Sequence, residues 1–384
     1  TPYQDWLADL ENANHELTEH FGTVTLKGFG VDDLPLGVAA AGVALHYVHR
    51  NSPGTQVHIS SLRKVSDEKF MGLDAFTVRN LELFKSLATQ GTHGTLISVI
   101  DATCTAQGAR LLKHWLKGPL NDKAAIEERL DRVAELVANE PVRRELRDLL
   151  RGINDLERIL GRLSTGRANP RDVANLANGL EITAHIKKTL TQHELPALSK
   201  LFDHLEDTSD LVVLVRAALM DAPPINLAKG NFIRSGYNEE LDELRGLASS
   251  GKKWIAELQA RERQRTDIPS LKIGFNNVFG YYIEVTRTHQ DKVPEDYIRK
   301  QTLVNAERYI TPELKEYEEK VLTAEERSLA LEKTLFDGVV KAVLERAGQV
   351  QSSARLVAMT DVAAGLAETA GRYDYCRPAL SDEP

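Results

Sequence analysis

Residues 271–311 interrupt what would otherwise be one continuous helical pattern, and this interruption constrains the fold more than any other stretch. Apolar residues recur at three- and four-residue spacing on both sides of it, over 241–258 before it and 314–342 after it. This spacing places them on one face of a helix. We therefore predict two long helices that form an antiparallel arm, with a different structure at its tip.

The interrupting segment has the composition of strands and turns. The run Tyr281 to Val285 is aromatic and β-branched, and Gly274, the pair Asn276-Asn277 and Gly280 divide the sequence around it. Aromatic and β-branched residues favour strands, whereas glycine and asparagine favour tight turns. The segment predicts a small β module, hereafter the head, at the end of the arm.

The arm helices are expected to be unusually long. The first is predicted from about Asn238 to Arg265, and the second from Thr311-Pro312, a pair that suits a helix start, to about Gly348. At ~1.5 Å per residue they measure roughly 40 and 54 Å. Helices of this length need a packing partner, so we expect them to pack against each other.

The rest of the chain predicts a helical bundle that follows part of an α/β unit. In residues 1–66 we expect a strand and turn at Thr25–Val31, a helix at Leu36–Val48 and a strand at Val57–Val65. Aromatic residues make up only 6% of the chain, which favours a mainly helical protein. Further helices are predicted at Thr77–Ala88, Thr105–Leu116, Lys123–Asn139, Val142–Leu150, Asn154–Arg162, Pro170–Thr191 and Ser352–Thr369.

Composition limits the possible classes of function. The net charge of −8 argues mildly against a nucleic-acid binder, although a small binding patch on an acidic scaffold is compatible with it. Two cysteines are too few for a disulfide framework or a structural zinc site, which favours a cytoplasmic protein. No apolar run is long enough to span a bilayer. The start at Thr1 without an initiator Met leads us to expect a fragment of a longer protein.

The head is the best candidate for a binding site. Its six basic residues outnumber five acidic ones, which gives +1 and leaves −9 for the rest of the chain. Arg299-Lys300-Gln301-Thr302 combines two cations with an amide and a hydroxyl, a set that suits phosphate oxygens. Regular strand alternation would place Arg299 and Gln301 on one face and Lys300 and Thr302 on the other. The alternative is that these charges only keep the head soluble.

No set of residues predicts catalysis or metal binding. The stretch from Gly246 to Lys253 resembles a phosphate-binding loop, but Lys253 stands where Ser or Thr should hold magnesium, and the stretch falls within a helical pattern. His46 and His49 share a helix face, yet the sequence places no third metal ligand beside them. We expect no enzyme activity, no metal and no cofactor.

Two long stretches closely resemble the clamp region of the MutS family of DNA mismatch repair proteins. They are LKIGFNNVFGYYIEV, residues 271–285, and QTLVNAERYITPELKEYE, residues 301–318. Shorter matches to the family occur in the same order at residues 73–75, 79–83, 108–116, 155–160 and 235–244.

The resemblance implies a layout and a mechanical role. Residues 1–66 would be the C-terminal part of an α/β connector domain, 67–270 and 319–384 the core or lever domain, and 271–318 the clamp. Two clamps, one from each subunit of a homodimer, would close around double-stranded DNA and touch its backbone. The residues that the match places in the clamp as candidate backbone contacts are Asn276, Asn277, Arg299, Lys300, Gln301, Thr302 and Asn305.

The resemblance also implies what this segment lacks. The family's mismatch-reading domain would precede Thr1, and its ATPase domain, with ATP and Mg²⁺, would follow Pro384. The implied partners are DNA, a second subunit and the protein MutL. The implied location is the bacterial cytoplasm, at the nucleoid during repair. The residues alone leave one alternative open, a helical scaffold whose head docks a protein instead of DNA.

Overall fold

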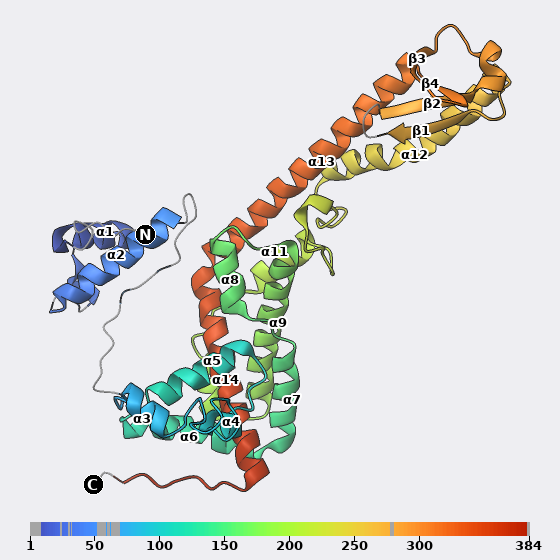
Figure 1. Cartoon of the computed structure of the whole chain (residues 1–384). Coiled ribbons are helices and arrows are strands. Elements are labelled where there is room, and N and C mark those ends of the chain that lie inside the picture. The colour runs from blue at the N-terminus through green and yellow to red at the C-terminus, as the bar shows by residue number, and fades with distance from the viewer. Residues whose placement is uncertain are drawn as a thin grey trace. The chain divides into compact units, whose positions relative to one another are not determined.

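The computed structural model describes residues 9–23, 25–29, 31, 33–51, 59, 62, 70–276 and 280–381, without the side chains of 27, 28 and 248–253. This described part is mainly helical and contains one small antiparallel sheet, which confirms the predicted fold class (Figure 1). Two compact units result: residues 217–338 form one, and residues 1–216 with 339–384 form the other. The domain boundaries expected from the sequence stay predictions.

The arm consists of α12, Glu239–Thr266, and α13, Pro312–Glu345. Both start where the sequence indicates. The side chain of Asn238 accepts a hydrogen bond of 2.9 Å from the N–H of Leu241, and the Thr311 hydroxyl accepts one of 3.2 Å from the N–H of Leu314. The stretch from Gly246 to Lys253 lies inside α12, as its helical pattern predicts.

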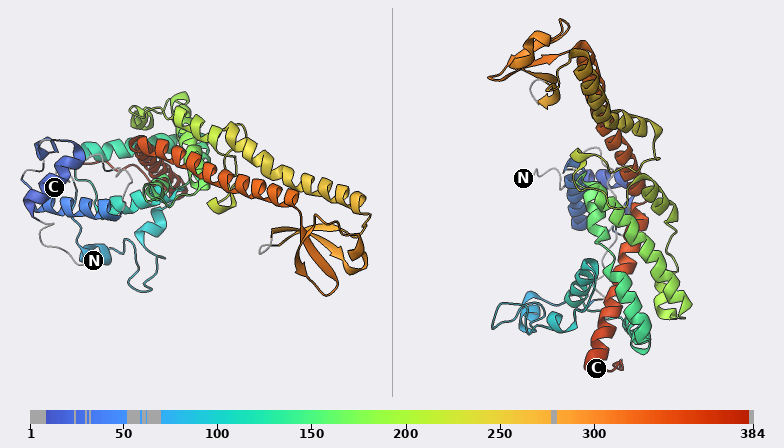
Figure 2. Two further views of the ribbon diagram at one scale, coloured as in Figure 1. Left: turned by 90° about the horizontal axis from the view of Figure 1, so that it is seen from above. Right: turned by 90° about the vertical axis from the view of Figure 1, so that its right-hand side faces the viewer.

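Contacts at several levels show that the arm helices run antiparallel and side by side (Figure 2). Near the head, Arg261 of α12 pairs with Glu313 of α13 at 2.5 Å. Further along, the rings of Trp254 and Tyr317 stack with their centroids 3.6 Å apart. A further cross-helix ion pair, Glu240 with Arg327, measures 3.2 Å.

The head is a four-stranded antiparallel sheet of order β1-β2-β4-β3. One face of it packs against the ends of the arm helices, where Ile283, Val285 and Tyr309 join Leu258 and Leu314 in a buried cluster. The predicted strand at residues 281–285 is confirmed. The strands are β1 Lys272–Asn276, β2 Gly280–Thr286, β3 Ile298–Thr302 and β4 Ala306–Ile310, with a 3₁₀ helix at Arg287–Lys292.

The other unit is a helical bundle built around α14, Ala347–Tyr373, which contacts α4 to α9. The carboxylate of Asp361 on α14 is fully buried and accepts hydrogen bonds from the N–H groups of Cys104 and Thr105, at 2.8 and 2.7 Å. Burial raises the pKa of Asp361, and these hydrogen bonds oppose the rise. A Cβ on Gly108 of α5 would lie 2.2 Å from an oxygen of Asp361, so this close approach requires glycine.

Several of the predicted bundle helices are confirmed within one to three residues at their ends. Their caps explain the starts: Thr105, Asp122, Asp155 and Asn169 each accept a hydrogen bond from a backbone N–H of the first turn. The confirmed helices are α5 Ala106–Lys117, α6 Lys123–Ala138, α7 Glu140–Arg151, α8 Leu156–Ser164 and α9 Pro170–Gln192. The structure adds α10 Pro196–Ser199 and α11 Ser209–Ala218, which the sequence analysis did not predict.

Two sequence predictions in this unit are wrong. The strand expected at Thr25–Val31 is instead a 3₁₀ helix, Leu26–Phe29, because Leu26 and Val31 bury against α1 and α2 in place of pairing with a strand. The helix expected at Thr77–Ala88 is short: α3 spans Ala75–Asn80, and Glu82 adopts a left-handed φ of 47°.

The remaining elements complete the description. The expected strand at Val57–Val65 lies outside the described residues except for Ile59 and Leu62. The predicted helix at Leu36–Val48 is confirmed as α2. In this unit α1 spans Leu10–Phe21, α2 Pro35–Asn51 and α4 Leu96–Ile100. Two further 3₁₀ helices lie at Lys200–Phe202 and Leu227–Lys229.

One buried carboxylate joins three parts of the arm unit. Glu332 of α13 is 1% exposed and accepts hydrogen bonds from the backbone N–H groups of Asn231, Phe232 and Ile233, at 2.9, 2.9 and 3.1 Å. It also pairs with Arg245 of α12 at 2.5 Å. This single side chain therefore holds both arm helices and the segment that leads into them.

We expect Glu332→Ala to lower the free energy of unfolding by about 3–5 kcal/mol, because it removes the closest carboxylate of Arg245 and leaves three N–H groups without their acceptor. Urea unfolding followed by circular dichroism measures the loss. Glu326→Ala is the matched control, since this exposed glutamate on the same helix should change stability by less than about 0.5 kcal/mol. Equal losses in the two variants would contradict the anchoring role.

Candidate functional site

A β-bulge at Lys300 decides which side chains of β3 share a face. Arg299 pairs with Tyr309 and Gln301 with Arg308, so two steps along β3 correspond to one step along β4. Lys300 is the extra residue. The prediction that Arg299 and Gln301 share a face is therefore wrong: Arg299 lies with Tyr309 on the packed face, and Gln301 lies with Arg308 on the open face.

On the packed side of the sheet, the charge of Arg299 is partly compensated. Its guanidinium lies 3.4 Å from a carboxylate oxygen of Glu307, which is 5% exposed and also accepts a hydrogen bond of 2.5 Å from the hydroxyl of Tyr309. Burial, together with this hydrogen bond, raises the pKa of Tyr309 to about 12. Glu307 therefore holds Arg299 at the edge of the sheet.

The open face carries one row of polar side chains across four strands. The strand register places Lys272, Glu284, Arg308 and Gln301 next to one another. Arg308 donates to Glu284 and to the side-chain oxygen of Gln301, both at 3.0 Å, and its guanidinium lies 4.1 Å from the ring centroid of Tyr282. The amide nitrogen of Gln301 is then left to donate outward.

Three cations of the described head have no ion-pair partner: Lys272, Arg287 and Lys300, all of which are exposed. Arg287 makes one side-chain hydrogen bond, of 3.2 Å, to the carbonyl oxygen of Leu303. The other basic residues are engaged, for example Lys292 with Asp267 at 2.6 Å. The weak overall charge of the head therefore conceals uncompensated positive charge at its surface.

The sequence-predicted residues occupy different positions in the head. Lys300, Thr302 and Asn305 are exposed on β3 and on the turn to β4. Asn276 ends β1 and is half-buried with contacts of its own, whereas Asn277 lies outside the described residues. Sequence reasoning missed Lys272 and Arg287 as candidate contacts. They are isolated along the chain, and only strand pairing places Lys272 in the polar row.

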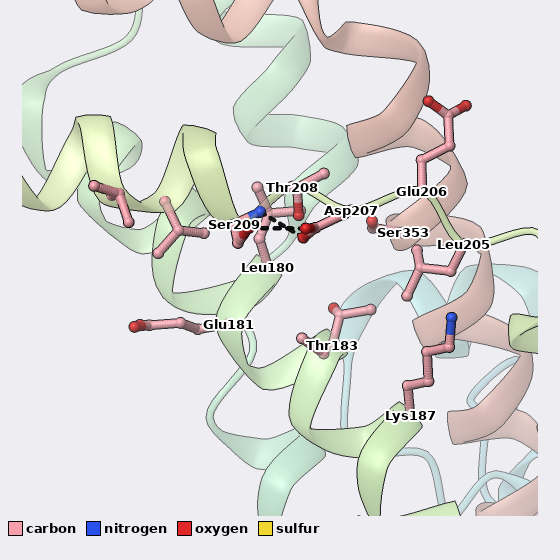
Figure 3. A pocket seen from close by; sticks show the side chains of 13 residues that line it. Leu180, Glu181, Thr183, Lys187, Leu205, Glu206, Asp207, Thr208, Ser209 and Ser353 are labelled. Atoms are coloured by element: carbon pink, nitrogen blue, oxygen red, sulfur yellow. Dashed lines mark hydrogen bonds between the residues drawn. The ribbon is translucent and has the colours of Figure 1, made fainter. Parts of the chain in front are cut away.

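The other unit contains a pocket of about 420 Å³, which lies among α9, α11 and α14 (Figure 3). The carboxylate of Asp207, which lines this pocket, accepts two hydrogen bonds of 2.9 Å from the backbone N–H and the hydroxyl of Ser209. These hydrogen bonds hold the pKa of Asp207 below its usual value.

Among the described residues, no cluster of three or more His, Cys, Asp or Glu side chains could hold a metal ion. His46 and His49 instead share Glu16, at 3.0 and 3.9 Å. No helix in this part of the chain has both the length and the apolar character needed to cross a bilayer.

Comparisons with known proteins cover nearly the whole sequence. The model of MutS domain III matches residues 76–367, and that of MutS domain II matches residues 1–60. The DNA mismatch repair protein MutS of Salinibacter ruber is 47% identical over 382 residues, 100% of this chain and 42% of that protein. The MutS of Symbiobacterium thermophilum is 48% identical over 369 residues, 96% of this chain and 42% of that protein. The chain thus spans less than half the length of these relatives.

Deleting Lys300 should preserve the sheet, because the deletion removes the bulge and keeps the partners of Arg299 and Gln301. We expect the local free energy of opening of β2 and β4 to change by less than about 1 kcal/mol. Hydrogen exchange of their backbone amides measures it.

Deletion of Arg308 is the matched control on the partner strand. It would force either Glu307 or Tyr309 off the packed face, since a slip of one residue reverses the faces of a strand. We expect it to lower the local stability by at least about 3 kcal/mol. Equal loss of protection in the two deletions would contradict the assigned register.

Proposed function

The chain belongs to the MutS family of DNA mismatch repair proteins, and we propose that its head is a clamp that holds the DNA backbone without reading sequence. The observation that carries this proposal is the group of unpaired cations at the end of a long helical arm, namely Lys272, Arg287 and Lys300. A rigid arm extends such a surface toward a ligand outside the protein.

The chemistry of the head favours phosphate over base edges. Lysine provides charge, while the hydroxyl of Thr302 and the amides of Gln301 and Asn305 provide short donors, and contacts of this kind to phosphate position a protein on DNA. A sheet with so few free cations would bind weakly by itself. We therefore propose that the clamps of two subunits act together on one duplex.

The arm would couple this contact to the rest of the protein. Glu332 ties α12, α13 and residues 231–233 together, which supports the proposal that the arm transmits a displacement from one end to the other. We propose that ATP and Mg²⁺ act in the part of the full-length protein outside this chain, and that the segment described here is not itself an enzyme. Its proposed partners are double-stranded DNA, a second subunit and MutL, in the bacterial cytoplasm at the nucleoid.

The first test compares binding of the 384-residue chain to a fluorescein-labelled homoduplex and to a duplex with one G·T mismatch. We expect equal affinities that fall steeply between about 50 and about 200 mM salt, because phosphate contacts release counterions. A version dimerised through a C-terminal leucine zipper should bind more tightly. Salt-insensitive binding, or none by the dimerised version at low salt, would overturn the proposal and favour a protein-docking head.

The second test compares the cations of the head that have no ion-pair partner with Arg299, which is paired with Glu307. Lys272→Gln, Arg287→Gln and Lys300→Gln should each lower the slope of log K against log salt by ~0.9 if the residue contacts one phosphate. Arg299→Gln should have a smaller effect, because Glu307 already offsets the charge of Arg299. Lys113→Gln, on the exposed surface of α5, is the control and should leave the slope unchanged. An effect of Arg299→Gln larger than that of Lys300→Gln would contradict this ranking.

A further inference from the structure

A second cavity of the helical bundle, about 350 Å³, differs from the one in Figure 3 because its lining is almost entirely apolar. It is formed by α5, α6 and α14 with residues of α4 and of the α5–α6 connection, and includes Trp115, Leu116, Leu130 and Met359. The charged side chains that line it are Arg129 and Arg132, both on α6. Its volume is at the lower end of the range for ligand pockets.

Arg129 has no anionic partner among the described residues. Its guanidinium carbon lies 3.6 Å from the ring centroid of Trp115, so the cation stacks on this ring. Burial, with the nearby charge of Arg132, lowers the pKa of Arg129 to about 10. A partly buried cation of this kind is costly unless an anion compensates it.

The acidic residues of α6 are already engaged elsewhere, so none of them compensates Arg129. Glu127 and Asp131 pair with Arg377 of the C-terminal segment. Glu128 pairs with Arg132 at 3.2 Å. Glu135 accepts hydrogen bonds of 2.7 and 3.0 Å from the backbone N–H groups of residues 197 and 198.

Arg132 is also incompletely satisfied. Its side chain is 11% exposed, and its Nε lies buried without a hydrogen-bond partner even though its Nη2 reaches Glu128. Of the two guanidinium groups at the border of this apolar cavity, Arg132 is paired with Glu128, whereas Arg129 has no carboxylate partner among the described residues. The cavity suits a ligand with an apolar body and a negatively charged group beside it.

The apolar surface extends beyond the cavity, which favours a peptide over a small molecule. Val137 is 41% exposed and lies one turn of α6 after Val133, so it prolongs the row that lines the cavity. On the other side, Met71 is 50% exposed, and its N–H donates to the carbonyl oxygen of Pro119 at 2.7 Å. Exposed apolar side chains therefore lie beside the cavity as well as in it.

We propose that this cavity docks a short segment of a partner protein, which inserts a large apolar side chain beside Trp115 and places a carboxylate against Arg129. The site lies in the bundle and does not depend on the clamp proposal. The recognition rests on charge complementarity, because the cavity offers two cations and no anion.

Fluorescence anisotropy with the 384-residue chain tests the proposal, using a fluorescein-labelled peptide GSLFDEGS and its neutral counterpart GSLFNQGS. We expect the neutral peptide to bind at least about 10-fold more weakly, because it lacks the charge-assisted contact. Arg129→Gln should weaken binding of the acidic peptide by a similar factor, and Arg129→Lys by less. Arg144→Gln, on the exposed face of α7, should leave binding unchanged. Thermal unfolding of each variant confirms that it is folded.

Three results would overturn the proposal. The first is no binding of the acidic peptide at about 1 mM. The second is equal affinity of wild type and Arg129→Gln for it. The third is binding of decanoate, a small amphipathic anion, while neither peptide binds, which would assign the cavity to a small ligand.

Discussion

The head depends on the burial of one face of its sheet against the ends of α12 and α13. A small sheet is not stable alone, and it gains stability only when one face is removed from water. The buried face of this sheet carries Ile283, Val285 and Tyr309, which pack against Leu258 and Leu314 near the ends of the arm helices. This packing sets the direction of the remaining side chains, so the surface available to a ligand is a consequence of it.

Charge in this molecule is organised locally more than globally. The chain is acidic overall, yet the head presents Lys272, Arg287 and Lys300 without carboxylate partners. Other carboxylates are used internally: Glu262 is buried and accepts from the hydroxyl of Tyr297 at 2.9 Å, and burial together with this hydrogen bond raises the pKa of that tyrosine. Glu307 likewise accepts a hydrogen bond from the hydroxyl of Tyr309, and burial together with this hydrogen bond raises the pKa of Tyr309. Net charge is therefore a poor guide to what one small surface can bind.

Charge is also organised locally in the helical bundle. Several other arginines of the bundle have carboxylate partners, such as Arg110 with Asp155 at 2.6 Å and Arg162 with Asp172 at 2.6 Å. Arg129 differs because the acids nearest to it in sequence are occupied by Arg377, Arg132 and backbone N–H groups. An uncompensated charge marks a candidate site in both units, at the head for phosphate and in the bundle for a carboxylate.

The sequence by itself determined the arm, its helix starts, the position of the head and the resemblance to a family, because these follow from local periodicity, capping and long motifs. Only the tertiary structure decided the faces of the head. The bulge at Lys300 depends on pairing with β4 and leaves no signal in the local sequence. The assumption of regular strand alternation therefore assigned Gln301 to the wrong face of the sheet. The same holds for the polar row through Lys272, which depends on strand pairing. It also holds for the failed strand at Thr25–Val31, where burial of Leu26 and Val31 against α1 and α2 decides the structure.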